Sequence, residues 1–188
     1  MSSELASLTG EPRPSGLLGQ TTLRLYGAVV PITWGSNLGG HPGWGTGFGL
    51  SYGIARATQI SIGFAYHRVN IISAENWDAW RQITTSLELI SPAADLVRPW
   101  LGVGLGYYDK ELYSPATMDV DATERGRRAQ FVTHQGSFGL NWGAGVALRF
   151  SRILWFEAGG RYNMSLDNPL DGNVELLSVQ AGLSYMVH

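Results

Sequence analysis

The stretch "GFGLSYGIARATQISIGFAYH", residues 47–67, repeats with a period of two, because a large apolar side chain alternates with a small or polar one. The alternation runs from Phe48 to Ile54 and resumes, after the short "ARAT", from Ile60 to Tyr66. Successive side chains of a β-strand point to opposite faces, so this pattern predicts two strands joined by a tight turn. One face of the predicted hairpin is apolar and aromatic, and the other carries only small or polar side chains.

The composition is unusual for a soluble domain of 188 residues, since only 15% of the residues are charged. A soluble domain averages about 25% charged residues. The chain has a single lysine, Lys110, and 25 glycines, many of them inside the alternating runs. The net charge is −2 and the longest basic run is "RGRR" (125–128), which argues against nucleic acid as a partner. The lack of cysteine excludes disulfides, thiolate zinc sites and thiol catalysis.

Eight stretches of the chain show the period of two, and each is about ten residues long or slightly longer. They cover about residues 22–31, 46–56, 58–68, 81–91, 98–109, 135–150, 153–165 and 174–187. This is the length that a tilted strand needs to cross a bilayer, and no apolar stretch approaches the roughly 20 residues of a membrane helix. Residues 1–20 lack the pattern of a secretory signal, so they are expected to be a tail or a small plug before a barrel at 21–188.

The connections between these runs alternate in length. "TWGSNLGGHPGWG" is long, "AT" is short, and the longest connection is expected from about Lys110 to His134. Outer-membrane barrels have short periplasmic turns and long extracellular loops, so this order places both chain ends on the short-turn side. The segment "AENWDAWRQI" (74–83) is expected in a loop, with Trp77 and Trp80 at the membrane surface.

Two kinds of barrel fit the alternation. A soluble carrier would turn the apolar side chains inward, whereas a membrane barrel would turn them toward lipid. The composition favours the membrane barrel, because a wet exterior would carry Lys, Glu and Thr instead of glycine. Eight strands enclose a bore that is only wide enough for side chains, which explains the many small inward residues. By parity, Trp100 and Trp155 also point inward near the short-turn end.

Two segments carry a resemblance to a known family. "RPWLGVGLGYY" (98–108) resembles a fifth strand, and "VQAGLSYMV" (179–187) resembles the terminal assembly signal, of the outer-membrane β-barrel domain family. That family includes the transmembrane domain of outer membrane protein A and its eight-stranded relatives. The resemblance implies an all-β, eight-stranded, antiparallel up-and-down transmembrane barrel in the bacterial outer membrane. The implied partners are outer-membrane lipid, lipopolysaccharide and the barrel assembly machinery, although Val187 replaces the family's terminal aromatic residue.

Several strongly polar residues fall on the inward face and are expected to pair within the bore. This interior polar network comprises Arg24, Glu88, Arg149, Glu157, Arg161, Asn141 and Gln180. Buried charges cost several kcal/mol each unless they are paired, so a permanent plug is the favoured interpretation. The alternative is a gate in a narrow porin-like channel for small solutes.

The remaining polar motifs give weaker predictions. "THQGS" places His134 and Ser137 three apart, and residues three apart on a strand face opposite ways. The pair therefore departs from the serine–histidine motif that the resemblance to lipid A deacylases would require, and no catalytic residue is expected. The acids of the long loops could bind calcium, but no metal site or cofactor is predicted; these acids are Asp119, Asp121, Glu124, Asp167 and Asp171.

The predicted function is a non-enzymatic outer-membrane protein with a structural or surface-interaction role. Its long loops would contact lipopolysaccharide, a partner protein or a host molecule. The loop arginines Arg125, Arg127 and Arg128 carry forked donors that suit lipopolysaccharide phosphates. A narrow channel, a lipid A-modifying enzyme and a soluble lipocalin-like carrier remain alternatives.

Overall fold

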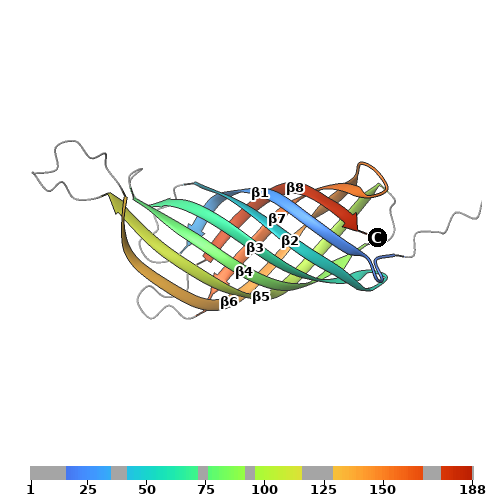
Figure 1. Cartoon of the computed structure of the whole chain (residues 1–188), viewed down its shortest axis with the longest axis horizontal. Helices are drawn as coiled ribbons and strands as arrows, with labels where there is room; N and C mark the ends of the chain where they lie inside the picture. The colour runs from blue at the N-terminus through green and yellow to red at the C-terminus, as the bar shows by residue number, and fades with distance from the viewer. Residues whose placement is uncertain are drawn as a thin grey trace, which may run out of the picture.

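Eight antiparallel strands, each paired with its neighbours in sequence, close into one barrel in the computed structural model. The structure describes residues 16–34, 42–71, 76–91, 96–115, 129–166 and 175–187. The strands are β1 (Thr21–Trp34), β2 (Gly43–Ala55), β3 (Thr58–Ile71), β4 (Asn76–Ile90), β5 (Val97–Pro115), β6 (Ala129–Arg149), β7 (Leu154–Ser165) and β8 (Glu175–Val187). Figure 1 shows them winding around a common axis. The described residues contain no helix that could cross a membrane.

Closure joins the first strand to the last. β1 pairs with β8 from Thr21↔Val187 to Trp34↔Glu175, with one irregularity between Val29 and Ile32. Pro31 lies in that interval and has no N–H to donate, which accounts for the local shift in register. Because every strand has two partners, the barrel leaves no open edge across its central part.

The outward face of the barrel is apolar. Leu25, Leu105 and Phe138 are 65%, 66% and 68% exposed, and all three belong to the apolar set of the alternation. The inward residues between them are mostly glycine, alanine, serine and threonine. This orientation confirms the eight-stranded membrane-type barrel and makes the soluble-carrier alternative wrong, because that carrier would enclose the apolar set.

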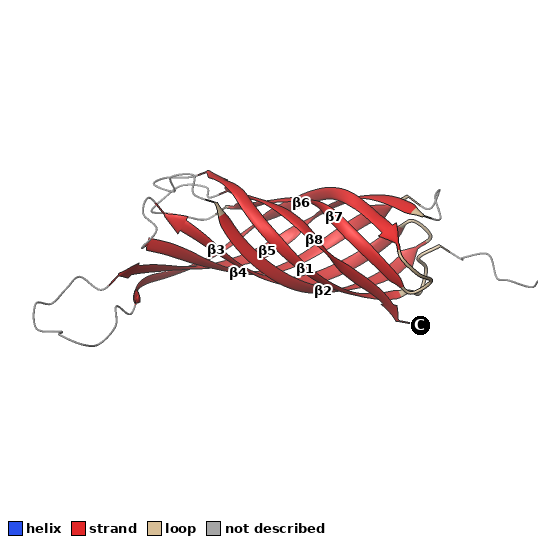
Figure 2. Ribbon diagram, turned by 90° about the horizontal axis from the view of Figure 1, so that it is seen from above, coloured by secondary structure: helices blue, strands red, loops and turns tan. Residues whose placement is uncertain are grey.

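The two ends of the barrel differ in height. β5 and β6 have 19 and 21 residues, whereas β7 has 12, so the β5–β6 hairpin rises beyond the rest of the wall. Figure 2 shows this extension at one end and the short turns at the other. β1 begins and β8 ends on the short-turn side, as the alternating connections predict.

Three expectations about the long-loop end are wrong. The connection expected from Lys110 to His134 is strand up to Pro115 and again from Ala129. The segment 74–83 is strand instead of loop from Asn76 onward, because β4 starts there and pairs Trp77 with Tyr113 of β5. Trp80 does not face the membrane surface but points inward and is 4% exposed. Arg81, Asp109 and Glu111 place charges on the outward face there, so the apolar alternation that marks a membrane strand is lost.

Candidate functional site: the filled bore and the outer face

An ion network around Glu88 fills the short-turn half of the bore. The Glu88 carboxylate is fully buried and lies 2.7 Å from Nη1 of Arg24 and 3.1 Å from Nη2 of Arg161. It also accepts hydrogen bonds from Gln59 Nε2 at 2.7 Å and Ser61 Oγ at 3.0 Å. Arg24 is on β1, Glu88 on β4 and Arg161 on β7, so the network ties distant parts of the wall together across the axis.

Two further residues complete this network. Glu157 Oε1 lies 3.4 Å from Arg24 Nε, so two arginines face two glutamates and their charges balance. Asn141 accepts a hydrogen bond from Ser86 Oγ at 2.8 Å and donates one to the Leu105 carbonyl at 3.1 Å. Because each buried charge has an opposite charge in reach, the desolvation cost of the network is offset within the protein.

The other two residues predicted for the network differ in their position relative to it. Gln180 lines a small cavity together with Arg24, Glu157 and Arg161 of the network. Arg149 lies at the short-turn end, where its Nε donates to the Ser151 carbonyl at 3.2 Å and its guanidinium is 6.0 Å from the Trp155 ring. It contacts none of the network residues. Parity gave the face of the sheet for Arg149, but not its height along the axis.

Aromatic side chains that point into the bore pack against glycines of neighbouring strands. A Cβ added to Gly145 or to Gly159 would come 2.8 Å from an atom of the Trp100 indole, and one on Gly139 would come 2.8 Å from the Tyr108 ring. Glycine weakens an ordinary strand, but here it leaves the space that a ring occupies. The high glycine content therefore belongs to the filling of the bore.

An apolar layer closes the bore nearer the long loops. It consists of Val30, Val69, Trp80, Tyr108 and Leu176, all at most 4% exposed. Sequence reasoning missed this layer, although the parity of Val30, Val69 and Leu176 places them inward.

Polar pairs lie on the same inward faces as this apolar layer. Gln82 Nε2 and His67 Nε2 are 2.9 Å apart in a buried pair. Asp78 is fully buried and lies 3.1 Å from Nζ of Lys110. Charges inside this half of the bore are therefore also compensated.

The short-turn end is covered by residues 16–20. The Leu17 N–H donates to the Arg56 carbonyl at 3.1 Å and the Gly19 N–H to the Gly53 carbonyl at 2.8 Å, which fastens this turn to the β2–β3 hairpin. The Leu17 side chain is 5% exposed and faces a small cavity that Trp155 also lines. Trp155 and Trp100 point inward, as their parity predicts.

Most of the candidate catalytic and metal-binding residues lie outside the described part of the chain. Ser137 points inward and is 8% exposed, while the His134 side chain lies outside the described part of the chain. No three His, Cys, Asp or Glu side chains in the described ranges could hold a metal ion together. The predicted loop residues also lie outside these ranges: Asp119, Asp121, Glu124, Asp167, Asp171, Arg125, Arg127 and Arg128.

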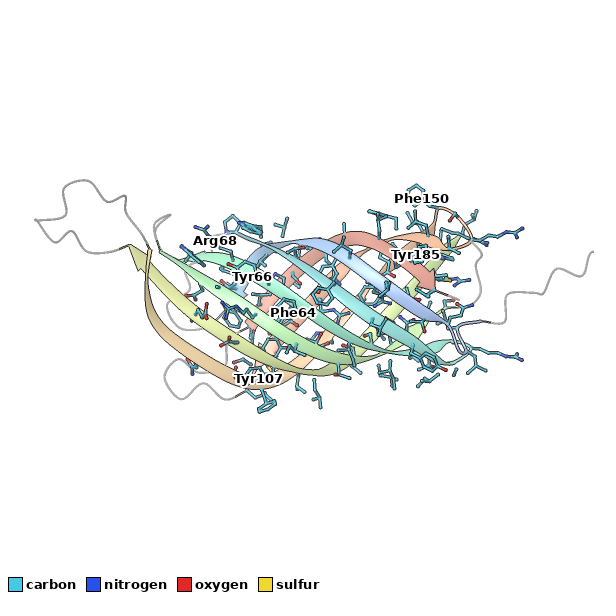
Figure 3. All side chains as sticks on the ribbon, in the orientation of Figure 1. Phe64, Tyr66, Arg68, Tyr107, Phe150 and Tyr185 are labelled. Atoms are coloured by element: carbon cyan, nitrogen blue, oxygen red, sulfur yellow. The ribbon has the colours of Figure 1, made fainter. Side chains whose placement is uncertain are left out.

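Aromatic residues gather at both ends of the apolar outer face. On the long-loop side, Trp142 stacks on Tyr162 with ring centroids 4.4 Å apart, and Trp44 lies 6.2 Å from Tyr66. On the short-turn side, Tyr185 is 46% exposed. Figure 3 shows Tyr66 and Tyr185 toward opposite ends of the barrel. Tyrosine and tryptophan at two levels are typical of the two interfaces of a membrane.

Comparison with known proteins agrees with this architecture. The family model described as "Outer membrane protein beta-barrel domain" matches residues 7–186. No curated protein matches the chain. Among solved structures, Neisserial surface protein A has 20% sequence identity and a TM-score of 0.66, covering 89% of this chain and 96% of that one.

Two further barrels share the fold at lower identity. OprG from Pseudomonas aeruginosa has 14% identity and a TM-score of 0.62, covering 93% of this chain and 98% of that one. Ail, the attachment invasion locus protein of Yersinia pestis, has 13% identity and a TM-score of 0.58, covering 90% of this chain and 99% of that one.

Proposed function

Because this chain belongs to the family of outer membrane protein beta-barrel domains, we propose that it is a non-conducting barrel of the bacterial outer membrane that displays a binding surface outside the cell. The observation that carries the proposal is the filling of the bore at successive levels. The turn at Leu17, the network around Glu88 and the apolar layer around Trp80 each occupy the axis. A bore of eight strands has room for such side chains and little else.

The tall β5–β6 hairpin supplies the displayed surface. From Gly136 toward its tip, β6 pairs with β5 and with no other described strand. Loops carried by a rigid scaffold are the usual place for binding residues. We propose that the loop after Pro115, with Arg125, Arg127 and Arg128, contacts lipopolysaccharide phosphates, a partner protein or a host molecule. Ail, the attachment invasion locus protein of Yersinia pestis, has a similar fold, which is compatible with such a role.

Planar-bilayer recording tests the closed bore. The purified chain, inserted into a bilayer, should give no steady conductance above the background of the lipid. Regular single-channel steps from the wild-type protein would overturn the proposal.

A narrow channel is the second candidate, and one observation favours it. A small cavity lies beside the network, lined by Arg24, Tyr26, Trp100 and Arg161, so the arginine side chains have space in which to move. If the network is a gate, the Glu88→Ala variant should conduct where the wild type does not. If both are silent, the side chains form a permanent plug.

We propose that the chain has no catalytic activity. Ser137 is 8% exposed on the inward face of the wall, and its spacing from His134 on the strand turns the two residues to opposite faces. The purified barrel should leave lipid A fully acylated in a deacylation assay. Turnover that is lost in Ser137→Ala would contradict this.

We also propose that β8 carries the signal for the barrel assembly machinery. Leu183 and Tyr185 alternate outward along this strand and are 49% and 46% exposed. In cells, Tyr185→Ser should lower the amount of folded protein in the outer membrane without preventing refolding of the purified chain in detergent. If Tyr185→Ser lowered folding equally in cells and in detergent, Tyr185 would have a structural role only.

A further inference from the structure

Arg68 projects from the outer face of β3 at the upper limit of the apolar surface. Phe64, Tyr66 and Arg68 follow one another along the strand toward the end that carries the tall hairpin (Figure 3). In the sheet Arg68 pairs with Trp44 of β2 and with Ala79 of β4. Its side chain therefore leaves the barrel one outward position beyond Tyr66 and level with Trp44.

The guanidinium of Arg68 lies over an indole ring. Its Cζ lies 4.4 Å from the centroid of the Trp77 ring, a distance typical of a cation–π contact. Stacking uses the face of the guanidinium and leaves the N–H groups at its edge available to an acceptor. Among the described residues, no carboxylate lies within 4.0 Å of these groups.

Arg81, the other outward arginine at this end of the wall, is already neutralised. Its Nη1 and Nη2 donate to the two carboxylate oxygens of Glu111, each at 2.8 Å, and Asp109 lies 3.7 Å away. This bidentate pair occupies the fork that an anion would need. Among the described residues at this end of the barrel, Arg81 thus has a carboxylate partner and Arg68 has none.

The surroundings of Arg68 indicate the boundary between lipid and water. Trp44 is 54% exposed and contacts Tyr66, while Ala79, on the adjacent strand, is only 1% exposed. At such a boundary, a tryptophan or tyrosine ring reaches the level of the headgroups. A cation at this level that has no carboxylate partner among the described residues is free to pair with a phosphate of the lipid.

We propose that Arg68, positioned by Trp77, is a binding site for a phosphate group of the lipid A portion of lipopolysaccharide. The forked donors of arginine match two phosphate oxygens at once, as a lysine would not. The inference rests on the proposed placement of the barrel in the outer membrane. It differs from the proposed loop contacts, because this site lies on the folded wall.

The test uses the full chain refolded into nanodiscs of phosphatidylcholine that contain either bis-phosphorylated lipid A or the same lipid without phosphates. Native mass spectrometry counts the lipid A molecules retained by the released barrel. The wild type should retain the phosphorylated form preferentially, and Arg68→Gln should lower that preference by about tenfold, the effect of losing one charge-assisted contact. Arg68→Lys, which keeps the charge but loses the fork, should keep only part of the preference.

The matched control is the double variant Arg81→Gln with Glu111→Gln, which leaves the net charge unchanged and should retain lipid A as the wild type does. Equal retention by Arg68→Gln and the wild type would overturn the inference. So would an equal loss in the control, or a wild type that does not discriminate between the two lipids. Protease protection of the strands in the same nanodiscs reports membrane insertion separately, so failure of this site is distinguishable from failure of the proposed membrane placement.

Discussion

Replacement of Glu88 by glutamine should cost more than any other single loss of charge in the described part of the barrel. Glutamine keeps the size of the side chain and can still bond to Gln59 and Ser61, but it removes the negative charge between Arg24 and Arg161. Two unit charges about 4 Å apart interact with ~4 kcal/mol at an effective dielectric constant of ~20. Two such attractions are lost, while relaxation and water entry recover part of them.

The expected loss is therefore about 3–5 kcal/mol, as is usual when one partner of a buried ion pair is removed. Urea unfolding of the refolded barrel in lipid vesicles, followed by tryptophan fluorescence, measures the free energy of unfolding. Glu111→Gln is the control, since it breaks the more exposed pair with Arg81 and should cost about 0–1 kcal/mol.

A double variant distinguishes loss of the ion pair from a change in how the single variant folds. The double variant Glu88→Gln with Arg24→Gln removes one charge of each sign, and it should lose less stability than the two single losses added together. If Glu88→Gln cost no more than Glu111→Gln, or if the double variant were simply additive, the ion network would not be the structural centre of the bore.

Three further variants probe the outer face, the glycines and the short-turn end. Leu105→Arg puts a charge on the lipid side, where the leucine is 66% exposed, and should lower the free energy of unfolding in vesicles by about 2–4 kcal/mol; Leu105→Ala should cost clearly less. Gly145→Ala places a methyl group against the Ala158 carbonyl oxygen of β7 and the Trp100 indole, and it should cost about 1–3 kcal/mol in the same assay, whereas Gly27→Ala, which meets no atom within 4 Å, should be neutral. The chain has no cysteine, so Ser184→Cys, at a position 2% exposed beside the lower cavity, gives a unique probe. Its reaction with a maleimide should be slow and should accelerate when Leu17→Ala is added; an unchanged rate would show that Leu17 does not cover this end.

The fold was predictable because lipid and a narrow bore impose opposite demands on alternate residues. From Phe48 to Ile54 every second side chain meets lipid, and the residues between them must be small. That contrast recurs along the barrel, although it is weak in β7, where most residues are half-buried. Eight strands, their order and the orientation of the apolar face therefore follow from the sequence. The inward direction of Arg24, Glu88 and Arg161 follows from the same parity.

Distances across the bore were not predictable in this way. Parity tells which way Arg24 points, but not that it meets Glu88, 64 residues away on the opposite side of the axis. It equally gave no means of separating Arg149, which lies at the turn, from the network. The strand extensions above the lipid were missed because Asp109 and Glu111 replace apolar residues on the outward face there.

The tallest part of the wall is also the part under the fewest physical constraints. The backbone of β5 and β6 beyond the barrel proper neither seals a bore nor meets acyl chains, and β6 there relies on a single neighbour among the described strands. Amino-acid replacements toward its tip need only preserve one ladder of backbone hydrogen bonds. The hairpin can therefore diversify in sequence while the rest of the wall is held fixed; on the proposed function, the displayed surface would then change without any change in the barrel that carries it.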